Sequence, residues 1–467
     1  MDLPGFGNDA TSKTVNTLTL GSQSEWRFEV ALDKTVNVKI LQGHAEIFGT
    51  ELALGHTYQF TATKLSIYTW LGCQIEWEGE VLGEYTSDES AMPNYANLHF
   101  ALEKLRAQAA AIDTQYIKKE IGAAATSGQP DREAEGPKVL IIGPRFSGKT
   151  SLAKILTAYA SKMGRSPVAI SLDPKESMLS LPGTISAATF ATMMDVEKTE
   201  TWSSSATTGP MHIPPKNPIV YYYGSDSPTD NIRFYKSVMN RLSLAVSSRI
   251  AVDAKARISG TIIDATGILD PKVGYDLIDT IVADFSVDVV VTVGNERLYN
   301  DLLKRYNARQ NMTVVKVPRS GGVVETDASY LRSIQQRLFK EYFYGQPKFP
   351  LSAFTVTVDI SAVTVYKRAE QSRLVSSSAL PIGTELSTAH ESLITKTAAS
   401  AALQNSILAL LYASPSDSEE DIAESSVMGF VHILDVDETK HKMKVLMPIK
   451  SRLPAQVYLM GSYHYME

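Results

Sequence analysis

Apolar and polar residues alternate along the N-terminal part of the chain, after about 20 polar residues that we predict to be flexible. The alternation involves the apolar residues Trp26, Phe28, Val30, Val36, Val38, Ile40, Ala45, Ile47, Tyr58 and Phe60, with turn glycines at Gly43, Gly49, Gly55 and Gly72. A period of two places successive side chains on opposite faces of a strand. The pattern therefore predicts a small antiparallel β domain over about residues 20–90.

The apolar period then changes to that of a helix between Asn94 and Ala110. Tyr95, Leu98, Leu102, Leu105 and Ala109 fall on one stripe, and Asn94 is a candidate N-cap. Residues 122–136 are rich in Ala, Ser, Thr, Gly and Pro, which is typical of a linker. We assign residues 1–20 to a flexible N-terminus, 21–110 to an N-terminal β domain with a trailing helix, and 111–136 to a linker.

Uninterrupted apolar runs alternate with helical segments in the middle of the chain. The runs are Val139–Ile142, Val168–Leu172, Ile219–Tyr223, Gly260–Ile263, Val287–Val293 and Met312–Val317. Strands buried on both faces need such runs, and helices between them make parallel crossovers. Residues 137–346 are therefore predicted to form an α/β domain with a parallel sheet.

The period of two returns after Phe349 and continues to Tyr465. One segment, about His390 to Tyr412, is interpreted as a helix, and the acidic stretch Ser414–Glu424 as an exposed loop. We predict a small C-terminal α/β domain over residues 347–467.

Composition narrows the classes of protein that the chain can belong to. Its 467 residues carry a formal net charge of -6, so any contact with nucleic acid must use a local patch. Cys73 is the single cysteine, which excludes an intramolecular disulfide and fits a reducing compartment. No apolar run approaches the ~18–20 residues that span a bilayer, so no membrane contact is expected.

The strongest chemical signal is the segment Gly143–Thr150, which matches the phosphate-loop (P-loop) pattern G-x-x-x-x-G-K-[ST]. It lies between an apolar strand and an amphipathic helix. In such a loop the backbone N–H groups and the helix N-terminus face the phosphates, the lysine balances their charge, and the Thr150 hydroxyl ligates Mg²⁺. The candidate nucleotide-binding residues are Gly143, Ser147, Gly148, Lys149, Thr150 and Ser151. The alternative is a glycine-rich turn that binds nothing.

The P-loop completes the predicted fold class. The chain is multidomain, with a central α/β P-loop NTPase domain flanked by an N-terminal β-sandwich and a small C-terminal α/β domain. Because no Asn-Lys-x-Asp guanine motif is present, the sequence favours ATP over GTP.

Two carboxylates follow predicted strands of the central domain, Asp173 and Asp264. Parallel sheets place ligands at the carboxyl ends of their strands. Both residues, with Thr150, are therefore candidate Mg²⁺ ligands, and either Asp173 or Asp264 could accept a proton from a nucleophile as the catalytic base. In the alternative interpretation each carboxylate only caps the loop or helix that follows it.

The order of short motifs resembles one family closely. After the P-loop come Leu181-Pro182-Gly183-Thr184, Pro228-Thr229-Asp230-Asn231, Glu296-Arg297-Leu298-Tyr299, Ser320-Gly321-Gly322-Val323-Val324 and Glu341-Tyr342-Phe343-Tyr344-Gly345, and Ala45 to Leu52 precedes it. The chain resembles the Clp-type, fungal members of the eukaryotic polynucleotide 5′-hydroxyl kinase family, which are subunits of pre-mRNA cleavage factor IA. The resemblance covers about residues 20–467.

This resemblance implies an ATP-binding subunit of the pre-mRNA 3′-end cleavage and polyadenylation machinery in the nucleus. The implied partners are the scaffold subunit that binds the RNA polymerase II tail and other 3′-end processing factors, and direct RNA contact stays open. Members of the family also hold the adenine from the N-terminal domain. The matching positions here are Glu25 and Lys64, which the sequence alone does not distinguish from surface residues.

The chain departs from active kinases of that family in the half of the site that would hold RNA. Active members carry Asp-x-Gly-Gln where this chain has Asp173-Pro174-Lys175-Glu176, and a stacking tryptophan where it has Ile268. Their arginine-rich lid corresponds here to residues 325–340, whose basic residues are Arg332, Arg337 and Lys340. Phosphoryl transfer needs such positive charge.

Three functions remain open at this point. The first, which we favour, is a scaffold that holds ATP as a structural ligand and thereby supports partner binding. The second is an active ATP-dependent polynucleotide 5′-hydroxyl kinase, in which Arg332, Arg337 or Tyr330 fills the missing roles. The third is an ATPase that acts as a mechanical switch.

Overall fold

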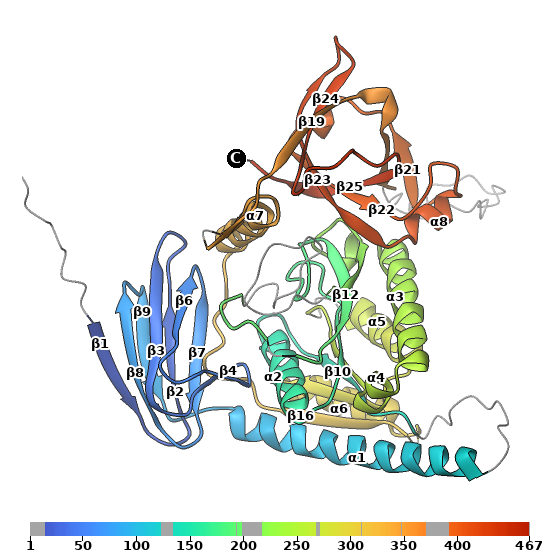
Figure 1. Ribbon diagram of the computed structural model, residues 1–467. Coiled ribbons are helices and arrows are strands. Elements are labelled where there is room, and N and C mark those ends of the chain that lie inside the picture. The colour runs from blue at the N-terminus through green and yellow to red at the C-terminus, as the bar shows by residue number, and fades with distance from the viewer. Residues whose placement is uncertain are drawn as a thin grey trace, which may run out of the picture.

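The structure is a computed structural model that describes residues 15–122, 134–192, 194–198, 217–267, 271–309, 311–346, 348–369 and 392–466. The predicted P-loop domain occupies the centre, with a β-sandwich on one side of it and a second β domain above (Figure 1). This confirms the predicted multidomain class. Residues 1–14 of the predicted flexible N-terminus lie outside the described residues.

The N-terminal domain packs two antiparallel sheets face to face. Their strand orders are β1-β8-β3-β6 and β5-β4-β7-β2-β9. The bounds are β1 Val15–Leu20, β2 Ser24–Glu29, β3 Thr35–Gly43, β4 Glu46–Ile47, β5 Thr50–Glu51, β6 Thr57–Thr61, β7 Lys64–Thr69, β8 Cys73–Gly79 and β9 Gly83–Ser87. Trp26, Phe28 and Trp77 lie in the core between the sheets. The prediction of a flexible segment is wrong for residues 15–20, because Leu18 and Leu20 alternate and β1 pairs with β8.

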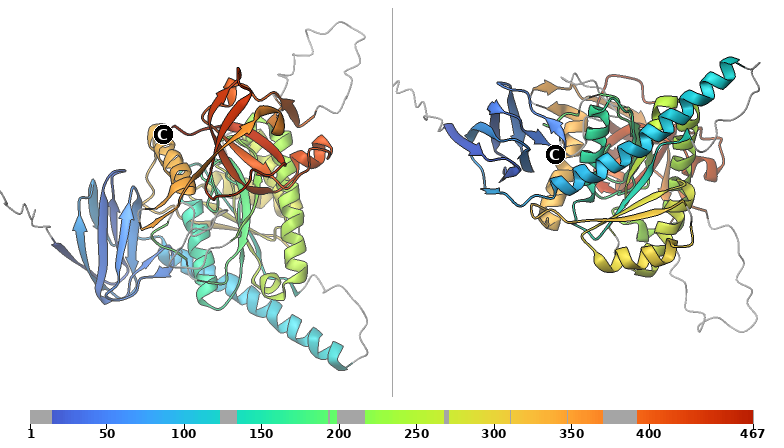
Figure 2. Two further views of the ribbon diagram at one scale, coloured as in Figure 1. Left: turned by 45° about the horizontal axis from the view of Figure 1, so that its top comes forward. Right: turned by 90° about the horizontal axis from the view of Figure 1, so that it is seen from below.

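A long helix, α1 (Met92–Gly122), runs from the sandwich along the outside of the central domain (Figures 1 and 2). The predicted linker is therefore wrong for residues 111–122, which are helical, whereas residues 123–133 lie outside the described residues. The helix continues beyond its apolar stripe, which ends near residue 110, and polar contacts as well as apolar ones hold it against the central domain. Arg106 Nε donates to the Ser259 carbonyl at 2.9 Å, and Arg257 Nη2 donates to Asp113 Oδ1 at 2.8 Å.

The central sheet has the strand order β13-β12-β11-β14-β10-β15-β16. Its strands are β10 Lys138–Ile142, β11 Val168–Ser171, β12 Thr184–Thr189, β13 Ile219–Tyr222, β14 Thr261–Asp264, β15 Val289–Val293 and β16 Thr313–Val317. The helices are α2 Lys149–Lys162, α3 Ile232–Val252, α4 Ala254–Ser259, α5 Pro271–Asp284 and α6 Glu296–Tyr306. All six predicted strands are present, and β10, β11, β14, β15 and β16 are parallel to one another. The sequence prediction missed β12, which pairs antiparallel with β11 and β13.

The C-terminal domain follows the helix α7 (Ala328–Tyr344) and is a seven-stranded sheet of order β19-β24-β23-β22-β25-β20-β21. Its strands are β19 Phe354–Asp359, β20 Thr364–Arg368, β21 Ile394–Thr397, β22 Ser406–Leu411, β23 Val427–Asp437, β24 Lys442–Met447 and β25 Val457–His464; a hairpin of β17 Gly345–Gln346 and β18 Phe349–Pro350 precedes them. The helix predicted near 390–412 is wrong, because β21 and β22 occupy that segment. The apolar run Ile407–Leu411 is a fully buried strand, which periodicity does not separate from a buried helix. The acidic stretch contains the short helix α8 (Glu419–Ala423).

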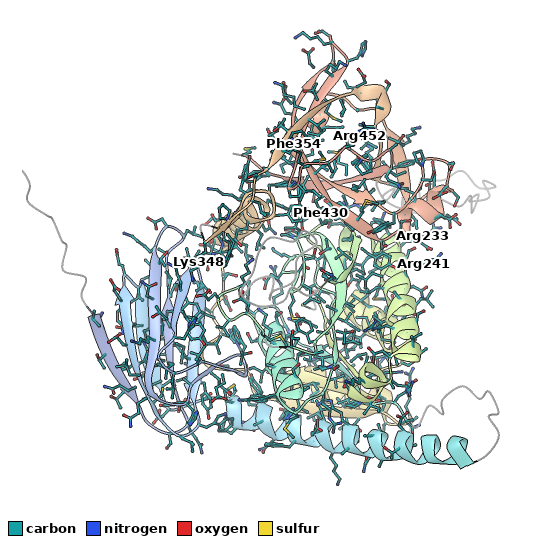
Figure 3. The ribbon with its side chains drawn as sticks, in the orientation of Figure 1. Arg233, Arg241, Lys348, Phe354, Phe430 and Arg452 are labelled. Atoms are coloured by element: carbon teal, nitrogen blue, oxygen red, sulfur yellow. The ribbon has the colours of Figure 1, made fainter. Side chains whose placement is uncertain are left out.

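Side chains join this domain closely to the central one. Phe430 of β23 lies at the junction (Figure 3), where its ring meets those of Tyr222 and Tyr342, each with centroids 5.7 Å away. Arg241 of α3, also labelled there, forms an ion pair with Glu424 beside α8. Helix α7 reaches both flanking domains: Gln336 Nε2 donates to the His464 carbonyl at 2.7 Å, and Arg337 Nη1 donates to the Thr61 carbonyl at 2.8 Å. The N-terminal and C-terminal domains are thus connected through one helix of the P-loop segment.

Candidate nucleotide-binding site

The P-loop has the backbone that its sequence predicts. It connects β10 to α2, and Gly148 precedes the helix with φ 88°, a left-handed conformation that favours glycine. Gly143 is required for space, since a Cβ there would lie 2.8 Å from Ser147 Oγ and 2.9 Å from the Val293 carbonyl oxygen. The successive N–H groups at the start of α2 thus have the arrangement that binds anions.

Two polar side chains of the loop are buried in a way that fits a phosphate ligand. Lys149 is 7% exposed, and its Nζ donates to the Pro144 carbonyl at 2.9 Å. Ser147 Oγ is buried, and among the described residues it has no hydrogen-bond partner. Buried polar groups are costly without a partner, and a phosphate oxygen supplies one. The residues present therefore fit the phosphates of a nucleotide.

The candidate metal ligands also come together beside the loop. Thr150 Oγ1 donates to Asp264 Oδ2 at 2.6 Å. Asp264 ends β14 and is fully buried, its other carboxylate oxygen has no partner among the described residues, and burial raises its pKa to about 7. Asp173 follows β11, accepts from the Lys175 N–H at 3.0 Å, and has its pKa raised by burial. A hydroxyl and carboxylates are ligands that Mg²⁺ prefers, although no group of three or more His, Cys, Asp or Glu forms a metal cage in the described parts of the chain.

The loop opens into a cavity of about 710 Å³ between the N-terminal sandwich and the central domain. Ser147, Gly148, Lys149, Thr150 and Ser151 line it, together with Asp173. Gly143 and Asp264 do not appear on its wall; Asp264 lies behind Thr150, to which it is bonded. The structure thus places most of the predicted site residues around one cavity.

Glu25 and Lys64, the two positions taken from the N-terminal domain, line the same cavity. Glu25 is 4% exposed; its carboxylate accepts from Arg27, from Ser66 Oγ at 2.9 Å and from Ser90 Oγ at 3.3 Å. Lys64 Nζ forms a 2.8 Å ion pair with Glu29 and lies 5.0 Å from the centre of the Tyr330 ring. A buried carboxylate and a lysine therefore face the P-loop from across the cavity.

The predicted lid contributes little positive charge to this cavity. Arg332 and Lys340 are exposed on α7, and Arg337 donates to the sandwich. The residues of the lid helix that line the cavity are Tyr330, Leu331, Ile334, Gln335 and Leu338. Glu176 lines it as well, whereas Ile268 lies outside the described residues.

Sequence reasoning missed several cavity residues, notably Arg27, Tyr85 and Tyr95 of the N-terminal part. A sequence signal that could have indicated this part of the site is the motif Ser320-Gly321-Gly322-Val323-Val324, which above supports only the family resemblance. Four of its residues, Ser320, Gly322, Val323 and Val324, line the cavity.

The fold and this site define a multidomain protein of the P-loop nucleotide-binding class. Comparison with known families matches residues 19–109 to "N-terminal beta-sandwich domain of polyadenylation factor", 143–345 to "mRNA cleavage and polyadenylation factor CLP1 P-loop", and 351–467 to "Pre-mRNA cleavage complex II protein Clp1". The chain belongs to the Clp1 family of mRNA cleavage and polyadenylation factors. The family resemblance drawn from the sequence is confirmed.

Individual relatives cover nearly the whole chain. The mRNA cleavage and polyadenylation factor clp1 of Botryotinia fuckeliana is 41% identical, with 99% of this chain and 98% of the relative covered. That of Phaeosphaeria nodorum is 37% identical, with 98% and 94% covered. A solved structure of a Clp1p–Pcf11p complex matches with a TM-score of 0.82 at 26% identity, covering 98% of this chain and 99% of the other. A second one, equal in TM-score and identity, concerns the extended Pcf11p–Clp1p interface and ATP loss in a glycine-to-arginine point mutant.

Among the described residues, no helix combines the length and apolar character needed to cross a bilayer.

Proposed function

We propose that this chain is an ATP-binding subunit of the nuclear pre-mRNA 3′-end cleavage and polyadenylation machinery, and that it holds ATP as a structural ligand. The observation that carries the proposal is the cavity itself, which is bounded by the P-loop on one side and by Glu25 and Lys64 of another domain on the other. A ligand that contacts both sides stabilises their arrangement by linkage. The relative whose structure concerns ATP loss supports the choice of nucleotide.

The roles of the chain's residues follow from their chemistry. Lys149, Ser147 and the N–H groups of residues 148–151 would hold the phosphates, and Gly143 provides the space for the loop. Thr150, Asp264 and Asp173 would hold Mg²⁺, which bridges and neutralises phosphate charge when bound. Glu25 and Lys64 would contact the base.

Retention rather than transfer is favoured by the lid helix α7, because none of its basic residues, Arg332, Arg337 and Lys340, lines the cavity, whereas Glu176 does. A migrating phosphoryl group and an RNA phosphate both require positive charge, which carboxylates oppose. The bound nucleotide would therefore support the docking of a partner. The solved complex of a related Clp1p with Pcf11p supports a protein partner. We infer that this chain's partner is the scaffold subunit that binds the RNA polymerase II tail.

The decisive experiment identifies the nucleotide in the full-length chain as purified. Heat release and chromatography are expected to yield intact ATP in about equimolar amount, still intact after prolonged incubation. Lys149→Ala should lose the nucleotide and bind the partner more weakly, whereas Lys104→Ala, an exposed lysine on α1, serves as the control. Release of ADP in place of ATP would favour the ATPase function. Unchanged stability and partner binding in Lys149→Ala would contradict a structural role for ATP.

A second function, a polynucleotide 5′-hydroxyl kinase, is favoured by one observation. Arg145 and Lys175 line the cavity near Asp173, so some positive charge and a candidate base are present. The test is transfer of labelled γ-phosphate to a 5′-hydroxyl RNA oligonucleotide. Transfer that disappears in Asp173→Asn would establish the kinase; absence of transfer by a chain that retains intact ATP supports the structural function.

A further inference from the structure

Arg27 projects from the sandwich toward the nucleotide cavity. Its neighbours on β2, Trp26 and Phe28, point into the sandwich core, and strand alternation turns Arg27 to the opposite face. The side chain is nevertheless only 8% exposed, and it lines the cavity. A charged residue so placed is not part of the sandwich core, and its burial must be explained by its partners.

Those partners accept four hydrogen bonds from the guanidinium, which has five N–H donors. Arg27 Nε donates to Glu25 Oε1 at 2.7 Å, and Nη2 bonds the same oxygen. Nη2 also donates to the Glu89 carbonyl at 3.1 Å, and Nη1 donates to the Tyr85 hydroxyl at 3.2 Å. The planar guanidinium thus fixes one oxygen of Glu25, while Ser66 and Ser90 bond the other. Lysine lacks this fork of donors.

The other side of Arg27 lies directly on the backbone of the glycine-rich motif. A Cβ at Gly322 would lie 2.8 Å from Arg27 Nε and 3.1 Å from its Cδ, closer than a real side chain permits. At the preceding Gly321, a Cβ would lie 3.5 Å from the nearest Arg27 atom, which is an ordinary contact. The second glycine is therefore needed for the approach of Arg27, and the first is not.

Val323, which follows Gly322 in the chain, contacts the P-loop. A Cβ at Gly148 would lie 3.0 Å from Val323 Cγ2, so Val323 covers the residue that precedes α2. The loop is fixed at its start by Tyr95, whose hydroxyl donates to the Pro318 carbonyl at 3.0 Å. A continuous line of contacts leads from Glu25 through Arg27, Gly322 and Val323 to Gly148.

We propose that Arg27 is a positioning residue of the nucleotide site, which holds the Glu25 carboxylate on one side and the Gly322–Val323 segment against the P-loop on the other. The inference rests on the proposed function, in that the ligand of this cavity is a purine nucleotide. The Glu25 carboxylate already accepts four hydrogen bonds, two from Arg27 and one each from Ser66 and Ser90, so it forms a fixed wall of the cavity. Arg27 links this wall to the P-loop side and thereby controls how fast a bound nucleotide is released.

The test measures the rate of ATP release and the melting temperature of the full-length chain and of Arg27→Lys. Loss of a charged hydrogen bond is expected to accelerate ATP release by about tenfold or more. Gly322→Ala, which displaces Arg27 from the opposite side, should produce the same change, while Gly321→Ala should leave the rate unchanged. Tyr275→Phe, which loses a hydrogen bond within the central domain, is the control for general stability and should also release ATP at the wild-type rate.

The outcomes separate this inference from the proposed function. A wild-type chain that retains no ATP overturns the proposed function itself. A wild-type chain that retains ATP, together with an Arg27→Lys chain that melts earlier but releases ATP at the wild-type rate, overturns the positioning role only, because Arg27 would then act through general stability. If Arg27→Lys does not fold, Gly322→Ala compared with Gly321→Ala gives the same decision.

Discussion

The hydroxyl of Thr150 donates a 2.6 Å hydrogen bond to the carboxylate of Asp264, and this bond joins the P-loop to the end of the neighbouring strand β14. The pairing leaves the second oxygen of a fully buried carboxylate without a partner among the described residues. The pKa of Asp264 is raised to about 7 by this burial. A group that titrates there makes both ligand binding and stability depend on pH near neutrality.

We predict that stabilisation by Mg²⁺ and ATP grows as the pH rises through about 7, since a cation binds the deprotonated carboxylate of Asp264. Without nucleotide, the stability of the chain changes with pH in the opposite direction. Between about pH 4 and pH 7 the native state keeps a proton that the unfolded state has lost, so the free energy of unfolding falls as the pH rises. At about 1.4 kcal/mol per pKa unit, the fall is at most a few kcal/mol. Asp264→Asn should reduce both trends in thermal melts from pH 5 to 8.5, to which other buried carboxyls such as Asp288 also contribute, and the exposed Asp33→Asn should show both in full. Equal pH profiles for Asp264→Asn and the wild type would contradict this assignment.

Tyr159→Phe is expected to destabilise the chain by about 1–3 kcal/mol, because it removes a buried hydrogen bond between domains. The Tyr159 hydroxyl of α2 bonds Glu46 of the sandwich, a carboxyl that is 5% exposed and whose pKa is raised by burial. The tyrosine bond opposes that rise. Its loss raises the Glu46 pKa further, so the destabilisation should be larger at pH 8 than at pH 5. Urea unfolding at both pH values measures it.

Tyr275→Phe is the matched control for that measurement, since the Tyr275 hydroxyl donates to Asp301 at 2.7 Å within the central domain. A loss in Tyr159→Phe that is the same at both pH values would show that Glu46 does not titrate in the native state.

His432→Leu should make the chain more resistant to acid. His432 is 1% exposed, with the Tyr465 ring centroid 5.1 Å away, and burial lowers its pKa to about 4. Between about pH 6.5 and pH 4 the unfolded state binds a proton that the native state does not, so stability decreases as the pH falls. The variant should lose up to about 3 kcal/mol less than the wild type over this interval. Melting curves at pH 4.5 and 7 test this prediction, and the exposed His56→Leu, as the control, should behave as the wild type. If His432→Leu also behaves as the wild type, His432 is protonated in the native state.

Gln336→Ala should loosen the C-terminal strand. The Gln336 amide bonds the backbone at two points, donating to the His464 carbonyl at 2.7 Å and accepting from the Met466 N–H at 3.2 Å. Since both bonds are exposed, we expect about 0.5–1.5 kcal/mol of local stability to be lost. Hydrogen exchange of residues 457–466 should accelerate about 2- to 12-fold at that cost. Exchange in Lys340→Ala, an exposed neighbour on the same helix, should stay at the wild-type rate.

The parts of the molecule that could be predicted from sequence are those whose cause is local. The close contacts that require Gly143 are made with Ser147 of the loop and with Val293 of the neighbouring strand β15, so the short pattern sufficed to predict the loop. Strand β12, with the sequence Thr-Ile-Ser-Ala-Ala-Thr, has mostly small residues and gave no apolar run, although it is almost entirely buried. The continuation of helix α1 past its apolar stripe could not be predicted, because single polar contacts, such as those of Arg106 and Asp113, leave no periodic pattern in the sequence.

The residues of the candidate site also divide into those with a local sequence pattern and those without one. Lys149 and Thr150 were identified by spacing alone, whereas Glu25 and Lys64 required a family resemblance because a glutamate and a lysine in a β domain look like ordinary surface residues. Arg27 was missed altogether. Its role depends on Gly322, which is remote in the chain and comes close only when the sandwich packs on the central domain.

Helix α7 touches both flanking domains through adjacent residues, Gln336 and Arg337, while its other side lines the cavity. The chain is for this reason poorly suited to dissection. A fragment that ends just after α7 lacks the C-terminal rings of Tyr463 and His432, against which the buried Phe339 and Phe343 pack. A fragment that begins at α7 lacks the sandwich strand whose Thr61 carbonyl accepts from Arg337. Fragments of the chain should aggregate when they are expressed separately, so reconstitution and crystallisation should start from the full-length chain.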